Sequence, residues 1–352
     1  MIDISREVKD HTRLCLLLLG LGGCGRPGRI APAVVLPVVY VAGSEVLPNG
    51  STGAVTWRNG VIMALNDLGK GSYATSLAVQ GNDLYVAGVE GNGSQDIALY
   101  WKNDASKQLT DGTKRGFANG IFVVGSDVYV AGAEDTTAMY WKNGVARNLS
   151  DGVEPAMAYS VTVATNGDVY VSGYQYKTTA VGANSFVVNP VATYWKNGVG
   201  VALTDGLRPS EAYALSMSGS DVYVAGYQCP STLVDCSRAS YWKNGVLNQL
   251  GDEPASTATS VVASGSSVYV TVNQALISGG VAKVRAAYWH DQVEATLSES
   301  IGASTSQVVI SGGDVYIAGS DSGSAGYWVN GVPVPLSSDS QSARGSSIVV
   351  AK

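Results

Sequence analysis

Carboxylates are the side chains of this sequence with the clearest potential for chemistry. Paired carboxylates can hydrolyse glycosides or bind calcium. The Asp of an LTDG-like element recurs along the chain, at Asp111, Asp151 and Asp205, with related residues at Asp67, Asp252 and Asp339. A residue repeated this often is more typical of a turn cap, because an active site should break the symmetry of a repeat. We therefore expect these Asp side chains to bond nearby backbone and to hold no metal.

Other catalytic groups are scarce. His11 falls in the N-terminal segment, and His290 occupies the Lys position of a YWKNG-like turn, where we expect a solvated side chain. The sequence contains no GxSxG, HExxH, EF-hand or P-loop motif. Cys229 and Cys236 lie in one segment, CPSTLVDC, without a nearby His, which favours a disulfide over a zinc site. We expect no cofactor, and we favour a binding protein over an enzyme.

The elements that would position such groups repeat along the chain. All seven Trp residues recur at near-even intervals, at Trp57, Trp101, Trp141, Trp195, Trp242, Trp289 and Trp328. A Tyr in a VYVAG-like segment alternates with them, at Tyr40, Tyr85, Tyr129, Tyr170, Tyr223, Tyr269 and Tyr316. These Tyr residues are separated by 45, 44, 41, 53, 46 and 47 positions. A repeat of this length, made of short strands and turns, is typical of a β-propeller blade.

One repeat, residues 117–153, shows how a blade is built. It contains four short segments rich in Val, Ile, Tyr and Trp, which suit buried strands: ANGIFVV, DVYVAG, AMYWK and VARNL. Asn143-Gly144 joins the last two segments, and Asn-Gly favours a type I′ hairpin turn. We expect the Trp side chains to be buried between neighbouring blades rather than to form a ring of stacking sites.

The two ends of the repeat region complement one another. Residues 38–43 read as the second strand of a blade without a first, whereas 343–352 read as a first strand without a second. If the C-terminal strand completes the first blade, each strand type occurs seven times. We predict an all-β fold over residues 38–352, a seven-bladed β-propeller with four antiparallel strands per blade, closed by the C-terminal strand.

The N-terminal residues indicate export. Residues 14–23, LCLLLLGLGG, form an apolar run too short to span a bilayer and typical of a signal peptide. The segment 21–24, LGGC, resembles a bacterial lipoprotein cleavage box, which implies a signal peptide at 1–23, lipidation of Cys24 and a linker at 24–37. An ordinary signal peptide with a chance Cys is the alternative. Gly25, the residue after the Cys, then suggests a location at the outer membrane or the cell surface. The periplasm and secretion are the alternatives. In each case we expect the protein to contact a membrane through the lipid alone.

Insertions break the symmetry of the repeat. The distance from the strand Tyr to the following Trp is 12 residues in blades three and seven, but 25, 19 and 20 in blades four, five and six. The extra residues of blades four and five carry aromatic and amide side chains, which suit recognition of a sugar or of a protein surface. Packing against neighbouring blades is the alternative. The candidate binding residues are Tyr174, Gln175, Tyr176, Asn184, Phe186, Tyr227, Gln228 and Arg238.

The repeat DVYVAGxx…AxYWKNGxxxxLTDG resembles that of uncharacterised exported bacterial β-propeller proteins with a lipoprotein-type leader. The resemblance covers residues 38–352 and implies fold and export, but no activity. We therefore expect a surface lipoprotein that binds a glycan or another envelope protein. A polysaccharide-active enzyme with acids on the loop side and a structural or adhesive envelope component are the alternatives. The net charge of −6 and the absence of a Lys/Arg run argue against a nucleic-acid partner.

Overall fold

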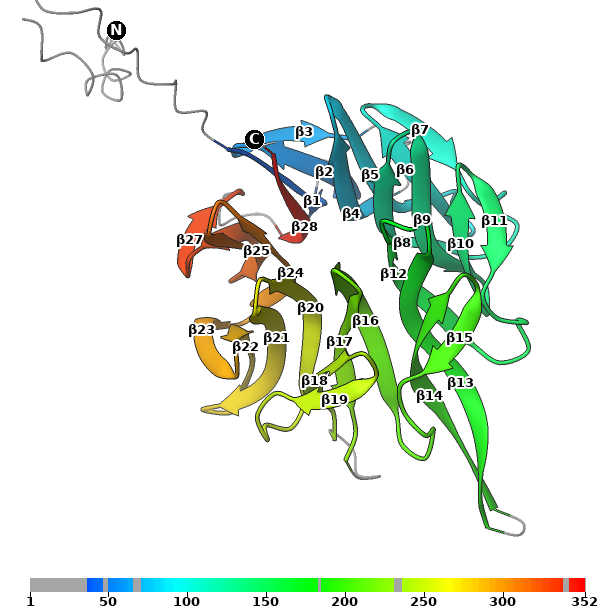
Figure 1. The fold of residues 1–352 in the computed structure, drawn as a ribbon. Helices are drawn as coiled ribbons and strands as arrows, with labels where there is room; N and C mark the ends of the chain where they lie inside the picture. Colours follow the sequence, from blue (N-terminus) through cyan, green and yellow to red (C-terminus); the bar gives the residue numbers. More distant parts are fainter. Residues whose placement is uncertain are drawn as a thin grey trace, which may run out of the picture. The chain divides into compact units, whose positions relative to one another are not determined.

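The computed structural model describes residues 37–46, 50–65, 71–182, 185–230, 236–337 and 342–351. In these segments the chain forms seven four-stranded antiparallel sheets and no helix. Figure 1 shows the sheets arranged as blades around a central axis, which confirms the predicted seven-bladed β-propeller. The predicted signal peptide and Cys24 lie outside the described residues. Within those residues, no helix is long and apolar enough to cross a bilayer.

Each blade has four strands, called a to d from the central axis outward. Strands a are β28 (Ala343–Ala351), β4 (Ser72–Gln80), β8 (Gly116–Val124), β12 (Ala156–Val163), β16 (Ser210–Ser218), β20 (Ser256–Ser264) and β24 (Ser304–Ser311). Strands b are β1 (Val38–Val46), β5 (Asp83–Gly91), β9 (Asp127–Glu134), β13 (Val169–Gly182), β17 (Asp221–Gln228), β21 (Ser267–Ser278) and β25 (Asp314–Asp321).

The two outer strands complete each blade. Strands c are β2 (Thr52–Arg58), β6 (Asp96–Lys102), β10 (Thr137–Lys142), β14 (Ser185–Lys196), β18 (Arg238–Lys243), β22 (Val281–His290) and β26 (Ser324–Val329). Strands d are β3 (Val61–Ala64), β7 (Ala105–Gln108), β11 (Val145–Asn148), β15 (Val199–Ala202), β19 (Val246–Gln249), β23 (Val293–Ser300) and β27 (Val332–Pro335). Six of the seven strands d are only four residues long, which limits the exposed sheet edge.

The ring closes as predicted. Strand β28 pairs with β1 from Val38↔Ala351 to Glu45↔Ala343, so the C-terminal segment supplies strand a of blade one. Ile348 is fully buried in this blade. Backbone hydrogen bonds therefore hold both ends of the repeat region in one sheet, that of blade one.

The core lies between blades. Each cluster of buried side chains combines residues of adjacent blades; Tyr85 of blade two, for example, packs in the same cluster as Trp141 of blade three. Six of the seven Trp side chains are 0–2% exposed, in agreement with the expected burial: Trp57, Trp101, Trp141, Trp195, Trp242 and Trp328. Trp289 is half-buried. In its blade Val272 replaces the Gly of the VYVAG segment. In four other blades a Cβ at this Gly would lie 2.8–3.1 Å from the Trp ring, so we infer that the Val272 side chain competes with the Trp289 ring for space.

The Asn-Gly turns are type I′ turns, as the sequence predicts. Asn143 and Gly144 have φ angles of 54° and 87°. The Asn143 side chain accepts a hydrogen bond from the Val128 amide at 2.9 Å and donates one to Asp127 at 2.8 Å. Lys142 forms an ion pair with the same Asp at 2.7 Å. The Asp of the a–b turn therefore ties two turns of one blade together.

The insertions of blades four and six continue the strands instead of forming loops. Strands β13 and β14 pair out to Gly182↔Ser185, and β21 and β22 pair out to Ser278↔Val281. Figure 1 shows the β13–β14 hairpin projecting from the ring. The inserted segment KTTAVG and its partner SFVVNP contain Thr, Val and Phe, whose high strand propensity explains why the ladder extends.

Candidate binding site at the central channel

Every strand a carries a β-bulge at the same place. The register with strand b skips one residue there in each blade, and the skipped residues are Ser346, Thr75, Asn119, Tyr159, Tyr213, Thr259 and Ser306. All seven line one cavity of about 420 Å³ on the central axis. A bulge redirects a side chain relative to the sheet, and here it produces a ring of seven side chains around the channel.

The side chains that line this cavity carry no charge. Besides the bulge residues they include several hydroxyls and the amide of Gln307. Some of these groups connect neighbouring blades: Thr75 donates to the Ala118 carbonyl at 2.7 Å, and Ser306 donates to the Gly345 carbonyl at 2.7 Å. A hydroxyl whose proton is used in this way still has acceptor capacity. The cavity wall therefore offers mainly neutral hydrogen-bonding groups.

Tyr159 and Tyr213 break the symmetry of the ring. The other five bulge residues are Ser, Thr or Asn, whereas blades four and five place two aromatic rings side by side, with centroids 4.9 Å apart. Tyr174 on β13 lies 6.0 Å from the Tyr159 ring, and Tyr227 on β17 lies 6.2 Å from the Tyr213 ring. Tyr176 continues the group at 5.8 Å from Tyr174. We call these five residues the tyrosine cluster.

One carboxylate lies within the tyrosine cluster. Glu211 on β16 accepts hydrogen bonds from the Tyr227 hydroxyl at 3.1 Å on Oε1 and from the Tyr159 hydroxyl at 3.4 Å on Oε2. Burial raises the pKa of Glu211, and hydrogen bonds from Tyr213, Tyr227 and Tyr159 oppose that rise. Burial also raises the pKa values of Tyr159, Tyr213 and Tyr227, so their hydroxyls stay protonated as donors.

The cluster lies toward one face of the ring. Glu211 is the second residue of its strand a, and Tyr227 is the next-to-last residue of its strand b. These strand ends meet the b–c and d–a connections, so we call this side the loop face. The predicted site region in blades four and five therefore contains the cluster, although the residues that reach the channel come from strands a.

The structure brings only some of the predicted binding residues together. Tyr174, Tyr176 and Tyr227 belong to the tyrosine cluster. Gln175 and Gln228 lie beside it in sequence, on β13 and β17, each opposite the first residue of the neighbouring strand a. Asn184 lies outside the described residues.

Phe186 and Arg238 are placed elsewhere. Phe186 pairs with Ala180 near the end of the projecting hairpin and is 63% exposed. Ala180 lies four positions beyond Tyr176, a distance of about 13 Å along a strand. The Arg238 guanidinium donates to the carbonyls of Cys236 and Ser237 at 3.2 and 3.3 Å, so it holds its own loop.

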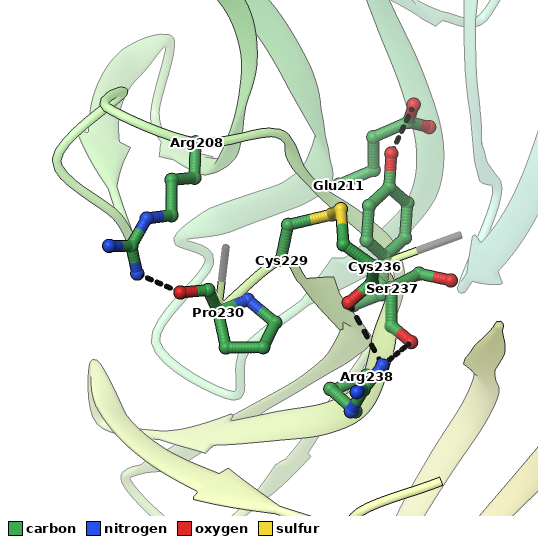
Figure 2. The surroundings of a disulfide bond; sticks show 8 residues. Arg208, Glu211, Cys229, Pro230, Cys236, Ser237 and Arg238 are labelled. Carbon is green, nitrogen blue, oxygen red and sulfur yellow. Dashed lines mark hydrogen bonds between the residues drawn. A yellow bond between two sulfur atoms is a disulfide. The ribbon is translucent and has the colours of Figure 1, made fainter. Parts of the chain in front are cut away.

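The predicted disulfide is present. Cys229 and Cys236 are joined with an S–S distance of 2.06 Å. Figure 2 shows the bond with two arginines nearby, Arg208 donating to the Pro230 carbonyl and Arg238 to its own loop. Cys229 is buried, and its amide donates to the Pro209 carbonyl at 3.0 Å. The bond fixes the b–c connection of blade five beside strand β16.

The repeated acids have structural roles. Asp111, Asp151 and Asp205 each accept a hydrogen bond from the backbone amide two residues further on, which confirms the expected turn caps. Asp252 accepts from the Gln249 side chain, and Asp67 and Asp339 lie outside the described residues. His290 is exposed and stacks on Tyr269 with centroids 4.3 Å apart. Across the described segments, no group of three or more His, Cys, Asp or Glu residues could hold a metal ion.

Sequence reasoning missed Tyr159, Tyr213 and Glu211. Tyr159 and Tyr213 occupy the bulge position of strand a. A signal existed in the sequence: aligned blade by blade, these positions carry Thr, Ser or Asn everywhere except in blades four and five. The insertions were selected because they depart from the repeat, and these strand positions depart from it in the same way.

Solved structures share the fold at low sequence identity. The crystal structure of the tricorn protease aligns with 85% of this chain at a TM-score of 0.53 and 11% identity; this chain spans about a third of its length, since 33% of that chain is covered. The β-propeller domain of the Trilobed protease from Pyrococcus furiosus, described as having an open velcro topology, aligns with 87% of this chain and 95% of its own at a TM-score of 0.52 and 10% identity. No protein-family model and no curated protein sequence matches the chain. The comparisons therefore define the class of fold, a β-propeller, and nothing finer.

Proposed function

We propose that this protein is a carbohydrate-binding module, with its site where the central channel opens toward the loop face at blades four and five. The observation that carries the proposal is the wall of the cavity: hydroxyl and amide groups without charge, with Tyr159 and Tyr213 side by side. Sugars present many hydroxyls and flat C–H faces. Neutral polar groups bond the hydroxyls, and tyrosine rings supply large apolar contact at low entropic cost.

Export supports this assignment. The disulfide is typical of an oxidising compartment. A signal peptide at 1–23 and lipidation of Cys24 would place the module in the bacterial cell envelope, where glycans are abundant. The resemblance to exported bacterial propeller proteins with this repeat has the same implication.

The chemistry of the acids favours binding over hydrolysis. A glycosidase needs two carboxyl groups flanking the bond, one of them a protonated acid. Lys142 and Asn143 hold the pKa of Asp127 below its usual range, and Asn197, Lys196 and Asn166 lower that of Asp168 to about 2. Burial raises the pKa of Glu211, but the groups that act on this carboxyl among the described residues are tyrosine hydroxyls and include no second carboxylate.

The test uses substitutions drawn from the repeat itself. Thr occupies the bulge position in blades two and six, so Tyr159→Thr and Tyr213→Thr should preserve the strand and the bulge. On a glycan array followed by titration calorimetry, we expect the full chain to bind a saccharide and each variant to bind it about tenfold or more weakly. Tyr73→Ala is the control, since Tyr73 is an exposed tyrosine of blade two outside the cavity.

Three results would contradict the proposal. These are the absence of binding to any saccharide, equal binding by the two Thr variants, and release of reducing ends from the bound glycan, which would indicate an enzyme.

A further inference from the structure

Glu211 occupies a position that the repeat does not reserve for an acid. In each blade this position lies two residues before the bulge residue of strand a. The equivalents in blades one to four and in blades six and seven are Arg344, Tyr73, Phe117, Met157, Thr257 and Ser304. Glu211 is therefore the one acid among seven equivalent positions, and it lies in the blade that also supplies Tyr213.

The carboxylate has no cationic partner among the described residues. None of their ion pairs includes Glu211. Its hydrogen bonds come from neutral phenols of β12, β16 and β17. A partly buried carboxylate without a counter-charge is unfavourable, because the loss of water is compensated only by neutral donors. A positive charge on a ligand would complete the site.

The Tyr rings around Glu211 also favour a positive charge on the ligand. The faces of tyrosine rings attract cations, and several rings around one point add their effects. Tyr159, Tyr174, Tyr213 and Tyr227 form a continuous chain of ring contacts of 4.9 to 6.2 Å around the Glu211 side chain. Tyr159 and Tyr213 also line the neutral cavity. The carboxylate thus lies next to the wall that would hold a sugar.

We infer that the saccharide bound here carries a free, protonated amino group, which Glu211 and the tyrosine cluster recognise while the uncharged cavity wall binds the hydroxyls. The inference rests on the proposed function, because it assigns the charge of the same ligand. An ammonium group donates hydrogen bonds to Oε1 and Oε2, and its positive charge lies against the ring faces of Tyr159 and Tyr213.

The experiment compares three tetrasaccharides that differ at one substituent. They are β-1,4-linked tetramers of glucosamine, of N-acetylglucosamine and of glucose, titrated into the full chain by calorimetry at a pH where the amine is protonated. A charged hydrogen bond changes affinity by about tenfold or more, so we expect the glucosamine tetramer to bind at least about tenfold more tightly than the glucose tetramer. Added salt should reduce this preference.

Substitution of the carboxylate isolates its contribution. Glu211→Gln keeps the size of the side chain and one acceptor oxygen, so we expect it to remove the preference for the glucosamine tetramer over the glucose tetramer. Glu294→Gln, an exposed acid at the start of β23, is the matched control and should leave all three affinities unchanged. Melting temperatures establish that each variant is folded.

The outcomes separate the two proposals. Equal binding of the three tetramers, or a glucosamine preference that survives Glu211→Gln, overturns the inference and leaves carbohydrate binding intact. If no saccharide binds, on the array or in titration, both the proposed function and this inference are overturned. Glu211-dependent binding of a lysine-containing peptide without binding of the glucosamine tetramer also overturns both, because the ammonium group would then belong to a protein ligand.

Discussion

At the scale of single residues, one backbone position recurs seven times with different side chains. The bulge gives each blade a residue that points into the channel, and Thr, Ser or Asn at that residue link neighbouring blades. Tyr159 and Tyr213 use the same position differently, since the Tyr159 hydroxyl turns to Glu211 and both rings line the cavity. The scaffold and the candidate site are therefore built from the same repeat position.

In six of the seven blades the Gly of the VYVAG-like segment lies beside the bulge, and in blade six Val272 takes its place. An added Cβ at Gly132 would lie 1.8 Å from the Phe117 carbonyl oxygen and 3.1 Å from Cζ3 of Trp141. We expect Gly132→Ala to lower the free energy of unfolding by about 2 kcal/mol or more, because neither the backbone nor the buried ring can move away easily. Chemical denaturation measures the change. Gly182→Ala is the control, since its nearest contact is an ordinary 3.7 Å, and equal losses in the two variants would contradict the explanation.

The pKa of Glu211 predicts a pH-dependent stability. Because burial raises this pKa in the folded state, the folded protein holds the proton to higher pH than the unfolded chain does. Its contribution to stability therefore falls as pH rises from the ordinary carboxyl pKa to the raised one. Glu211→Gln does not titrate, so its melting temperature should rise relative to that of the unmodified protein as the pH increases above the ordinary carboxyl pKa. A difference in melting temperature that is constant across this range would show that Glu211 titrates normally.

At the scale of elements, three consecutive blades carry the departures from the repeat. The β13–β14 and β21–β22 hairpins extend blades four and six, and the disulfide constrains blade five between them. The tyrosine cluster is formed by strands a and b of blades four and five. Insertions at this face change the surroundings of the channel without altering the turns that hold each blade together.

The disulfide should stabilise its loop more than the fold. Chain-entropy arguments give about 2.5 kcal/mol for a closed loop of this length, and Cys229 keeps its backbone bond to Pro209 when the sulfurs are separated. We therefore expect the Cys229→Ser/Cys236→Ser double variant to fold and to lose less than about 3 kcal/mol of unfolding free energy. Mass spectrometry with and without reductant, on protein purified from a bacterial periplasm, tests for the bond. Two free thiols in that material, or loss of folding in the double variant, would disagree with this prediction.

At the scale of the whole molecule, closure joins the first and last blades. Strand β28 contributes Ile348 to the core of blade one, and the Ser347 hydroxyl bonds both the Leu77 amide of blade two and Gln307 of blade seven, at 3.1 and 2.7 Å. One strand therefore connects three blades. Its loss should affect the ring as a unit.

Deletion of residues 343–352 should destabilise the entire propeller. The truncation exposes the inner edge of β1 and removes a buried side chain of the core, a cost of about 5 kcal/mol or more. A loss of this size lowers the melting temperature by about 8 °C or more in a domain of this size. Ile348→Ala and the exposed Val145→Ala provide a buried and a surface comparison. A truncated protein that melts within a degree or two of the full chain would mean that closure contributes little.

The sequence by itself determined the number of blades, the strand order, the closing strand, the type I′ turns and the disulfide. These features are local or periodic: each blade repeats its own strands and turns, so spacing and turn chemistry are sufficient to recognise them. The repeat pattern also predicted that the Trp side chains are buried. Trp289 is the one exception, and it lies in the blade where Val272 replaces the Gly. The sequence shows only how long the insertions are. That the insertion of blade four forms a hairpin depends on the pairing of β13 with β14, which the structure shows.

Only the tertiary structure decided which side chains meet at the channel. Tyr159 and Glu211 are separated by 52 positions and lie in different blades, and they meet because all seven strands a converge on one axis. The bulge then turns Tyr159 and Tyr213 into the cavity, an effect of register between two strands that no local pattern encodes. The repeat therefore specifies the scaffold. The candidate site is specified by blades four and five, which depart from the repeat at the bulge positions where their strands a converge.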